Sequence, residues 1–324
     1  MTTAPKPRTS KALDPRVGRN RRGQPVHGWV ALDKPFGMTS TQAVAAVRRL
    51  FDAAKAGHGG TLDPLATGLL PVALGEATKT VAWAMDGSKT YRLTVRWGIA
   101  TATDDAEGAV VATSDARPAR SAIEAALPAF TGTIMQVPAT YSAIKVDGRR
   151  AYDLARAGEA VELAARPIRI DRLSLVELPD ADHAVFEVVS GKGAYMRSLG
   201  RDLAVALGTV GHLTALRRAR VGRFDESVAI TLDKLSSLGH IARLSEYLLP
   251  IETALDDIPA LALTEAEALR LRHGQPVSPL RPSDRACIDQ LGNGSIVSVS
   301  TGGKLVALTE IDAGMLRPVR VLNI

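Results

Sequence analysis

The chain has 324 residues, of which 46% are hydrophobic and only 4% aromatic. This length and composition are typical of a globular protein with one large core and room for a smaller domain. The single cysteine excludes an internal disulfide and a cysteine-based metal cluster, and the 6 histidines show no paired metal-ligand spacing. There is neither the apolar run of about 18 residues that a membrane span needs nor an apolar N-terminal signal region, so we expect a cytoplasmic protein without membrane contact.

The formal net charge of +6 favours a polyanionic partner such as a nucleic acid. Basic residues are concentrated in the polar, proline-containing segment 1–26, where Asp14 is the single acid. We expect this segment to be a disordered arm. Its composition is compatible with phosphate binding and equally with a solvated tail.

Hydrophobic spacing predicts a series of strands and helices along the next two thirds of the chain. In chain order they are a strand at 28–32, a helix at 39–52, a strand at 69–75, a helix at 76–85, a strand at 89–98, a helix at 120–130, a strand pair at 168–176 and 184–189, a helix ending at 207 and a strand at 211–220. The acidic loop 100–107 lacks the positional pattern of a calcium site. We expect it to be solvated.

The last part of the chain, 256–324, is predicted to be a small β-barrel-like module. Thr264 is placed to cap a short helix with acidic residues in its first turn. Strand-like runs follow at 296–299, 305–309 and 319–322, separated by glycine and proline. A boundary at 256–259 separates this module from the rest.

The stretch from His58 to Leu70 is too rich in glycine to form a long regular helix, and it contains a single carboxylate, Asp63. Asp63 precedes Pro64, which biases it toward an extended or turn conformation. A buried strand is predicted to follow directly. Catalytic groups often lie on loops that a rigid scaffold holds in this way. The same pattern also fits an aspartate that only hydrogen-bonds its own backbone.

Two further segments suggest contact with a nucleic acid. Segment 136–155 is basic, contains two tyrosines and a turn, and fits either a loop that grips a nucleic acid or an ordinary hairpin. Segment 190–199 is a glycine-rich approach to a helix, a geometry that can bind phosphate. Its spacing is neither that of a Walker motif nor that of a dinucleotide-binding fold, so we do not expect a nucleotide cofactor.

Several of these segments resemble, in the same order, the motifs of the stand-alone bacterial TruB-type tRNA pseudouridine synthases. His58–Leu70 resembles motif II, Leu32–Pro35 the N-terminal motif, Lys89–Tyr91 the tyrosine segment, Tyr141–Tyr152 the RNA-gripping thumb, and Tyr195–Arg197 and Leu216–Arg218 two further motifs. Together they extend from about 28 to 225. The tail resembles, less sharply, the PUA module attached to these enzymes.

The resemblance implies an α+β protein that isomerises uridine 55 in the T-arm of tRNA to pseudouridine, by base flipping. The expected organisation is a catalytic domain with a mixed sheet at 27–255, a thumb loop at about 138–165, and a PUA-like RNA-binding module at 256–324. No metal and no organic cofactor is implied. The expected partner is tRNA, with no obligate protein partner, and the expected state is a monomer.

The resemblance also implies roles for individual residues. Asp63 is the catalytic carboxylate, Tyr91 stacks on the target base and Arg197 pairs with Asp63. The residues expected to bind substrate are His58, Lys34, Tyr195, Leu216, Lys145 and Arg149. A single carboxylate in the central loop differs from a hydrolytic glycosidase, which typically needs two. Whether Asp63 attacks C1′, attacks C6 or removes a sugar proton is left open.

Two other functions fit parts of the same pattern. The basic balance, the thumb and the C-terminal module would also suit a non-catalytic RNA-binding or tRNA-folding module. Such a protein has no need to keep Asp63, Tyr91 and Arg197 together. The chain also resembles the catalytic subunit of an RNA-guided complex, although the intact thumb favours independent action.

Overall fold

The structure is a computed structural model that describes residues 23–324, apart from 143, 147, 158, 160–161 and 240. Positions 1–22 of the expected basic arm, 1–26, lie outside the described residues. The last residues of the arm, 23–26, are described, and the disorder expected for them is wrong. The Gln24 amide donates to the carbonyl of Asp52 at 2.5 Å, and the Gln24 carbonyl accepts from Ala54 at 2.9 Å. These backbone bonds hold the segment against the end of the first helix.

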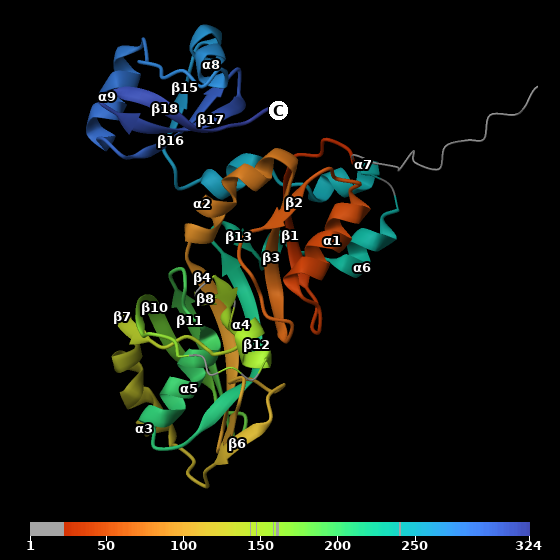
Figure 1. Ribbon diagram of the computed structural model, residues 1–324, viewed down its shortest axis with the longest axis vertical. Coiled ribbons are helices and arrows are strands. Elements are labelled where there is room, and N and C mark those ends of the chain that lie inside the picture. The colour runs from red at the N-terminus through yellow and green to blue at the C-terminus, as the bar shows by residue number, and fades with distance from the viewer. Residues whose placement is uncertain (1–22, 143, 147, 158, 160–161, 240) are drawn as a thin grey trace, which may run out of the picture.

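A large mixed sheet forms the body of the protein (Figure 1). Its strands, in spatial order, are β14 (Ile230–Thr231), β1 (Gly28–Lys34), β3 (Ala66–Leu74), β12 (Gly211–Val221), β4 (Lys89–Trp97), β11 (His183–Ser190), β10 (Arg166–Glu177) and β7 (Gly132–Gln136), with β2 (Ala56–His58) beside β3 and β13 (Phe224–Asp225) beside β12. The pairs β1–β14 and β3–β12 are parallel and the other pairs antiparallel. The expected α+β class with a mixed sheet is confirmed.

Helices and short hairpins surround this sheet. The helices are α1 (Ser40–Leu50), α2 (Val81–Asp86), α3 (Arg120–Ala126), α4 (Ala151–Arg156), α5 (Met196–Ala206), α6 (Leu232–Ser237) and α7 (Ile241–Leu244), with 3-10 turns η1 (Gly75–Thr80), η2 (Leu127–Phe130), η3 (Glu226–Val228), η4 (Ser245–Tyr247) and η5 (Ile251–Leu255). The hairpins are β5 (Ile99–Thr101) with β6 (Val110–Thr113) and β8 (Lys145–Val146) with β9 (Arg149–Arg150).

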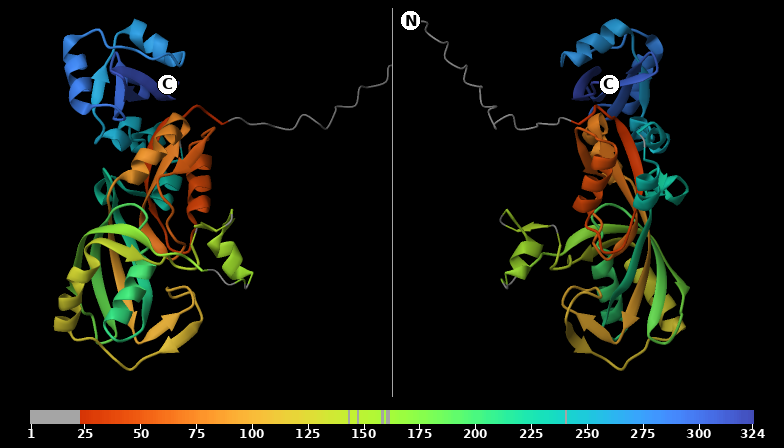
Figure 2. Two further views of the ribbon diagram at one scale, coloured as in Figure 1. Left: turned by 60° about the vertical axis from the view of Figure 1, so that its left-hand side comes forward. Right: turned by 90° about the vertical axis from the view of Figure 1, so that its right-hand side faces the viewer.

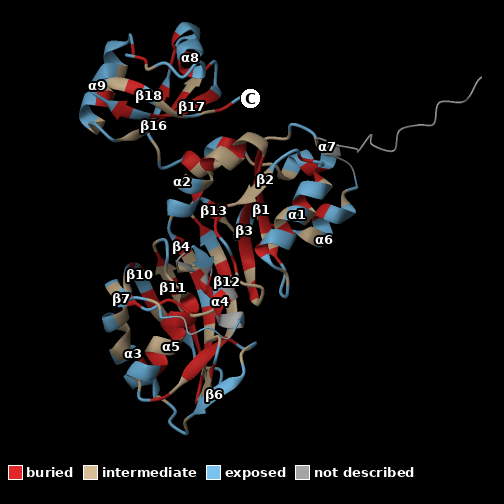
Figure 3. Ribbon diagram, in the orientation of Figure 1, coloured by how far each residue is buried: buried red, intermediate tan, exposed pale blue. Residues whose placement is uncertain are grey.

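The apolar run of β3 has both faces covered, as Figure 3 shows by burial. Successive side chains of a strand point to opposite faces. Leu70 and Val72 therefore pack with α1 and α6, while Leu69 and Ala73 pack with Trp29 on the other face. The Asp63 loop leads into this strand, so the C-terminal end of the loop is anchored in a strand that is covered on both faces.

The other half of the sheet carries α5. Leu199 and Leu203 of this helix pack with Val95 of β4 and Leu213 of β12. The close approach is possible because position 200 is a glycine: a Cβ there would lie 2.7 Å from a methyl carbon of Leu213. This contact positions the first turn of α5 beside the N-terminal end of β3.

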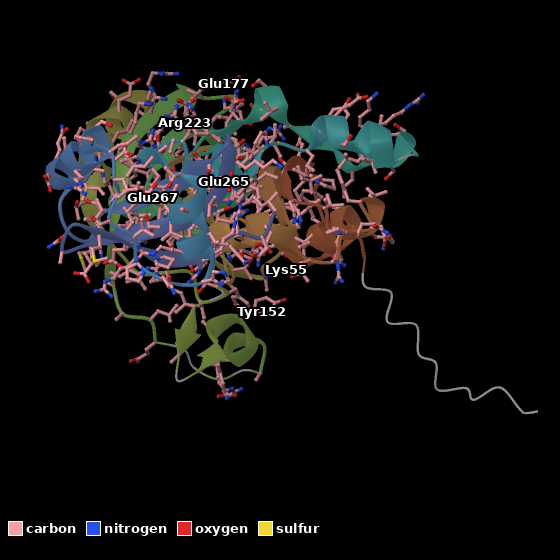
Figure 4. The ribbon with its side chains drawn as sticks, turned by 90° about the horizontal axis from the view of Figure 1, so that it is seen from above. Lys55, Tyr152, Glu177, Arg223, Glu265 and Glu267 are labelled. Carbon is pink, nitrogen blue, oxygen red and sulfur yellow. The ribbon has the colours of Figure 1, made fainter. Side chains whose placement is uncertain are left out.

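The segment that contains β8, β9 and α4 stands off from the sheet (Figure 2). Tyr152, on α4, lies where this segment joins the body: its amide donates to the carbonyl of Ser142 and its ring faces Tyr141 (Figure 4). The segment falls within the expected thumb, about 138–165. Its shape is that of a hairpin followed by a short helix.

The C-terminal part is a four-stranded module with its own core. Its elements are β15 (Ala260–Ala262), α8 (Glu265–Arg272), α9 (Pro282–Leu291), β16 (Ile296–Thr301), β17 (Lys304–Asp312) and β18 (Met315–Val321). Thr264 caps α8 as predicted, and Glu267 completes a capping box. The small β-module is confirmed, and α9 is a helix that the sequence pattern did not predict. Leu305, Leu308 and Leu322 pack against the catalytic sheet near Trp29.

Candidate active site

Asp63 lies on the loop between β2 and β3, and the backbone on both sides of it is held by buried side chains. The Ser40 hydroxyl donates to the carbonyl of Leu62 at 2.9 Å and accepts from its amide at 2.8 Å. The Lys34 ammonium donates to the carbonyl of Pro64 at 3.3 Å. The loop is therefore fixed immediately before and after the carboxylate, and the Asp63 side chain remains 38% exposed.

Arg197 joins three segments that are far apart in the sequence. Its Nε donates to Asp63 Oδ2 at 2.8 Å, Nη1 to the carbonyl of Thr103 at 3.0 Å and Nη2 to the carbonyl of Tyr141 at 2.8 Å. The side chain is nearly buried, in the first turn of α5. The predicted Asp63–Arg197 pair is thus formed, and it also binds the segment that leads into the thumb.

The acidic loop 100–107 is not the solvated loop that its composition predicted. Asp105 is only 9% exposed, and its Oδ2 lies 3.6 Å from Nη1 of Arg197. Asp104 pairs with Arg201 at 2.8 Å, and burial raises the pKa of Asp104 although the Arg201 charge opposes this. Asp104 and Asp105 face α5, whose Arg201 and Arg197 neutralise them, whereas Glu107 is exposed.

A cleft of about 270 Å³ opens beside Asp63. Five of the predicted residues line it: Asp63, Arg197, Tyr91 of β4, Tyr195 just before α5, and Leu216 of β12. The backbone of Tyr195 is bracketed by the Gln136 side chain, which accepts from its amide at 2.8 Å and donates to its carbonyl at 3.1 Å. The carboxylate, two aromatic rings and an apolar side chain therefore line one cavity.

Lys34 has no exposed surface, so the direct substrate contact expected of it is corrected to a supporting one. Its ammonium binds the carbonyls of Pro35, Met38 and Pro64. Burial lowers the pKa of Lys34 to about 8; the charge of Asp63 opposes that shift and the charge of Arg218 adds to it. Lys34 acts on the site by holding the backbone next to Asp63.

The other predicted substrate contacts are less closely joined to the cleft. His58 ends β2 and is not among the cleft-lining residues; burial, and then the charge of Arg218, lower its pKa. Arg149 is exposed, and its guanidinium donates to both carboxylate oxygens of Glu159, at 3.0 and 2.8 Å. Lys145 starts β8, and its side chain falls outside the described part of the structure.

Two buried cations of the cleft were not predicted as site residues. Lys89 donates to the carbonyls of Met85 and Gly87, at 2.7 and 2.5 Å, and burial, together with the charge of Arg218, lowers its pKa to about 8. Arg218 is 2% exposed, and in the described part of the chain its partners are carbonyl oxygens and not carboxylates. The cleft wall is therefore strongly cationic.

The comparisons with known proteins agree with this geometry. The family model for the TruB family pseudouridylate synthase N-terminal domain matches residues 48–196, and that for the tRNA pseudouridylate synthase B C-terminal domain matches residues 197–256. A tRNA pseudouridine synthase B of Rhodospirillum rubrum is 59% identical over 308 residues, which is 95% of this chain and 100% of that protein. The chain belongs to the TruB family of pseudouridylate synthases, and it is an isomerase.

Other members of the TruB family are similar over the same extent. The tRNA pseudouridine synthase B of Gluconacetobacter diazotrophicus is 57% identical over 94% of this chain and 100% of its own length. Among solved structures, a chain of a Cbf5–Nop10–Gar1 complex aligns with a TM-score of 0.68 at 25% identity, covering 92% of this chain and 84% of that one. A chain of an archaeal box H/ACA Nop10–Cbf5 complex gives the same TM-score at 24% identity, with 96% and 92% covered, and supports the fold.

Sequence reasoning missed Asp105, Lys89, Arg218 and Ser142 for a common reason. Each owes its place in the site to burial by distant segments. Ser142, which lines the cleft, buries its hydroxyl without a hydrogen-bond partner among the described residues. The sequence did carry a signal for Lys89 and Arg218, because both lie inside segments that resemble motifs of the family.

The described residues contain no group of three or more His, Cys, Asp and Glu side chains arranged to hold a metal ion. In the same residues, no helix has the length and hydrophobicity to cross a membrane. The groups that face the cleft are one carboxylate, several cations and two phenol rings. This set can bind an anionic, aromatic substrate and hold an ionised carboxylate against it.

Proposed function

We propose that this pseudouridylate synthase acts on uridine 55 in the T-arm of tRNA, with Asp63 as the catalytic carboxylate. The activity is that of its family: it isomerises uridine to pseudouridine in tRNA, as the close relatives are named to do. The observation that supports the residue assignment is the Arg197 Nε to Asp63 Oδ2 bond of 2.8 Å at the edge of a cationic cleft.

The reaction breaks the N1–C1′ bond, turns the uracil and forms a C5–C1′ bond; the C5 proton leaves and N1 gains one. A carboxylate acts in such a step as nucleophile or base only when ionised. Arg197 supplies the opposite charge and fixes the side chain, since arginine stays protonated. The single bond to Nε leaves the other carboxylate oxygen, Oδ1, outside this contact.

The target base must leave the helical stack before it reaches Asp63, which costs a few kcal/mol. Tyr91 and Tyr195 offer aromatic faces in the cleft, and stacking on such a face contributes about 1–3 kcal/mol per base. The fixed cations in the wall, Lys89 and Arg218, add an attractive field for the phosphates that flank the flipped nucleotide.

The domains have separate tasks in this proposal. Residues 27–255 carry the reaction, and the thumb at about 138–165 grips the T-arm. Residues 256–324 add RNA-binding surface. The residues that contact the substrate are His58, Tyr195, Leu216, Lys145 and Arg149. The protein acts as a monomer on bare tRNA, without a guide RNA, an obligate protein partner, a metal ion or an organic cofactor. Its substrate places the reaction in the cytoplasm.

The test compares wild type with Asp63→Asn on a tRNA transcript carrying tritium at uridine C5, with RNA binding measured in parallel. Wild type should release tritium in the presence of EDTA, once tRNA folding is controlled for, whereas Asp63→Asn should bind and release none. A transcript with cytidine at position 55 is the control for the site. Release by the variant would contradict the role of Asp63, and binding without release by wild type would favour a guide-dependent complex.

A further inference from the structure

Phe36 is exposed in a protein that buries its other phenylalanines. The chain has 5 phenylalanines. Phe51, Phe186 and Phe224 are at most 1% exposed, and Phe130 is partly buried, whereas Phe36 is 65% exposed. Leaving so much apolar ring in water forgoes the free energy that burial of an aromatic side chain provides.

The turn that carries Phe36 is fixed to the catalytic loop. The Lys34 ammonium binds the carbonyls on both sides of it, Pro35 at 2.8 Å and Met38 at 2.7 Å. The amide of Gly37 donates to the carbonyl of Pro64 at 2.8 Å. Gly37 takes a φ of +78°, which permits the tight turn. The backbone of Phe36 is therefore held in place, because the next residue, Gly37, is hydrogen-bonded to Pro64, which follows Asp63 in the chain.

Single exposed apolar side chains are common on protein surfaces and usually need no explanation. Phe36 combines three features: its exposed ring is aromatic, its turn is fixed by hydrogen bonds, and that turn is bonded to the loop of the catalytic carboxylate. Val205, by comparison, is 64% exposed in the last turn of α5. A ring on a turn that is hydrogen-bonded to the Asp63 loop loses little further conformational entropy when a planar ligand covers it.

We propose that Phe36 is a stacking platform for an unpaired base of the RNA substrate, at the rim of the active site. The inference rests on the proposed function, because extrusion of the target base leaves neighbouring bases without a stacking partner. Unstacked bases in loops are the parts of an RNA that proteins cover with aromatic side chains. Stacking of this kind is independent of sequence, since every base has a π-face.

The test measures equilibrium binding to a tRNA transcript and turnover for Phe36→Ala, Phe36→Leu and Phe36→Trp. Phe36→Ala should weaken binding about 5- to 150-fold, the range that the loss of one stacked base gives. Phe36→Trp should restore it and Phe36→Leu should not, because leucine keeps the apolar surface and lacks the π-face. The fold loss should be the same at about 50 and 200 mM salt, unlike the loss of a phosphate contact.

Val205→Ala is the matched control, since it removes an equally exposed apolar side chain and should leave binding unchanged. Circular dichroism melting should be nearly the same for all variants, because the Phe36 side chain is largely exposed. Equal binding by wild type and Phe36→Ala would overturn the inference, as would full binding by Phe36→Leu. The binding assay separates this outcome from failure of the proposed function, which shows as wild-type protein that releases no tritium.

Discussion

The catalytic cleft and the C-terminal module bury charge in different ways. Four cations are at most 7% exposed in the catalytic part of the described chain: Lys34, Lys89, Arg197 and Arg218. In the module, the one buried charged side chain among the described residues is Glu267, which Figure 4 places in α8. The rest of the module core carries no charged side chain among the described residues and is built mainly by apolar residues such as Val297 and Val299.

The difference shows in which part of the protein buried charge lowers the stability of the fold and serves the reaction. A buried charge costs several kcal/mol of desolvation, which hydrogen bonds and opposite charges only partly recover. In the module the buried carboxylate caps a helix, so it serves the fold. In the catalytic part, Lys34 and Arg218 hold carbonyl oxygens of the Asp63 loop, while Lys89, Arg197 and Arg218 line the cleft. Buried cations are therefore concentrated at the candidate site of this protein.

The largest effect that would test this contrast is expected at Arg197. Arg197→Met leaves Asp63 without its charge partner and frees the carbonyls of Thr103 and Tyr141. We expect kcat to fall about 100-fold or more, with RNA binding changed much less. Arg197→Lys keeps the charge but loses the fork of donors, so its kcat should be intermediate. Single-turnover rates measure both, and an unchanged rate in Arg197→Met would refute the role of the pair.

Adjacent arginines provide the next test. Arg218 binds the carbonyls of Gly60, Thr61 and Leu69, whereas its neighbour Arg217 forms partly exposed ion pairs with Asp33 and Glu226. Arg218→Lys should lower kcat about tenfold, because a single ammonium on a flexible stem does not reproduce the planar fork of donors of the guanidinium. Arg217→Lys should have little effect on kcat, since exposed pairs contribute at most about 1 kcal/mol.

The same pair tests the electrostatics of the cleft. The Arg218 charge is one cause, after burial, of the lowered pKa of Lys89. In Arg218→Met the pKa of Lys89 should rise from about 8 toward its usual value, and in Arg217→Met it should not. Titration of labelled lysine side chains by NMR measures the shift. A folded Arg218→Met protein with an unchanged Lys89 pKa would show that burial alone sets it.

A smaller effect is expected in the module, at Glu267. Its carboxylate accepts from the amides of Thr264 and Leu280, at 2.8 and 3.0 Å. Burial would raise the pKa of Glu267, but these hydrogen bonds lower it overall. A carboxylate with a lowered folded-state pKa stabilises the fold above its unfolded pKa of 4.5, and this contribution is lost as the pH falls through the folded value.

Glu267→Gln should therefore reduce the free energy of unfolding by about 1 kcal/mol at pH 7, with turnover on saturating tRNA unchanged. The difference from wild type should narrow below about pH 4. Thermal unfolding at pH 7 and at pH 3 measures both. Asp289→Asn, which alters an exposed carboxylate on α9, is the control for an ordinary surface carboxylate of the module. A lower kcat in Glu267→Gln would break the contrast between module and cleft.

The smallest effect is expected at the N-terminus. Residues 24–26 are held by backbone bonds, so deletion of residues 1–22 leaves every described contact of the cleft in place. Turnover at saturating tRNA should remain within about twofold of wild type. A rise in KM alone would assign the basic arm to phosphate binding, and a collapse of kcat would show that it takes part in the reaction.

The sequence predicted most of the elements near the site, for local reasons. Thr39 caps α1 as its hydroxyl suggested, and the alternation in 89–98 gave β4. The Asp63–Arg197 pair was predicted by resemblance to motifs, because 134 residues separate the two in the chain. The solvated loop predicted at 100–107 was wrong, since composition alone does not reveal that α5 supplies arginines to its carboxylates.

The sequence by itself determined the family and most of the elements and indicated the candidate carboxylate, because motifs, caps and hydrophobic periods are properties of neighbouring residues. Tertiary structure decided which charges are buried and which face the cleft. Arg217 and Arg218 are adjacent and chemically identical, and the sheet register alone directs one to solvent and the other to the Asp63 loop. Burial is set by the segments that pack around a residue, and those come from distant parts of the chain.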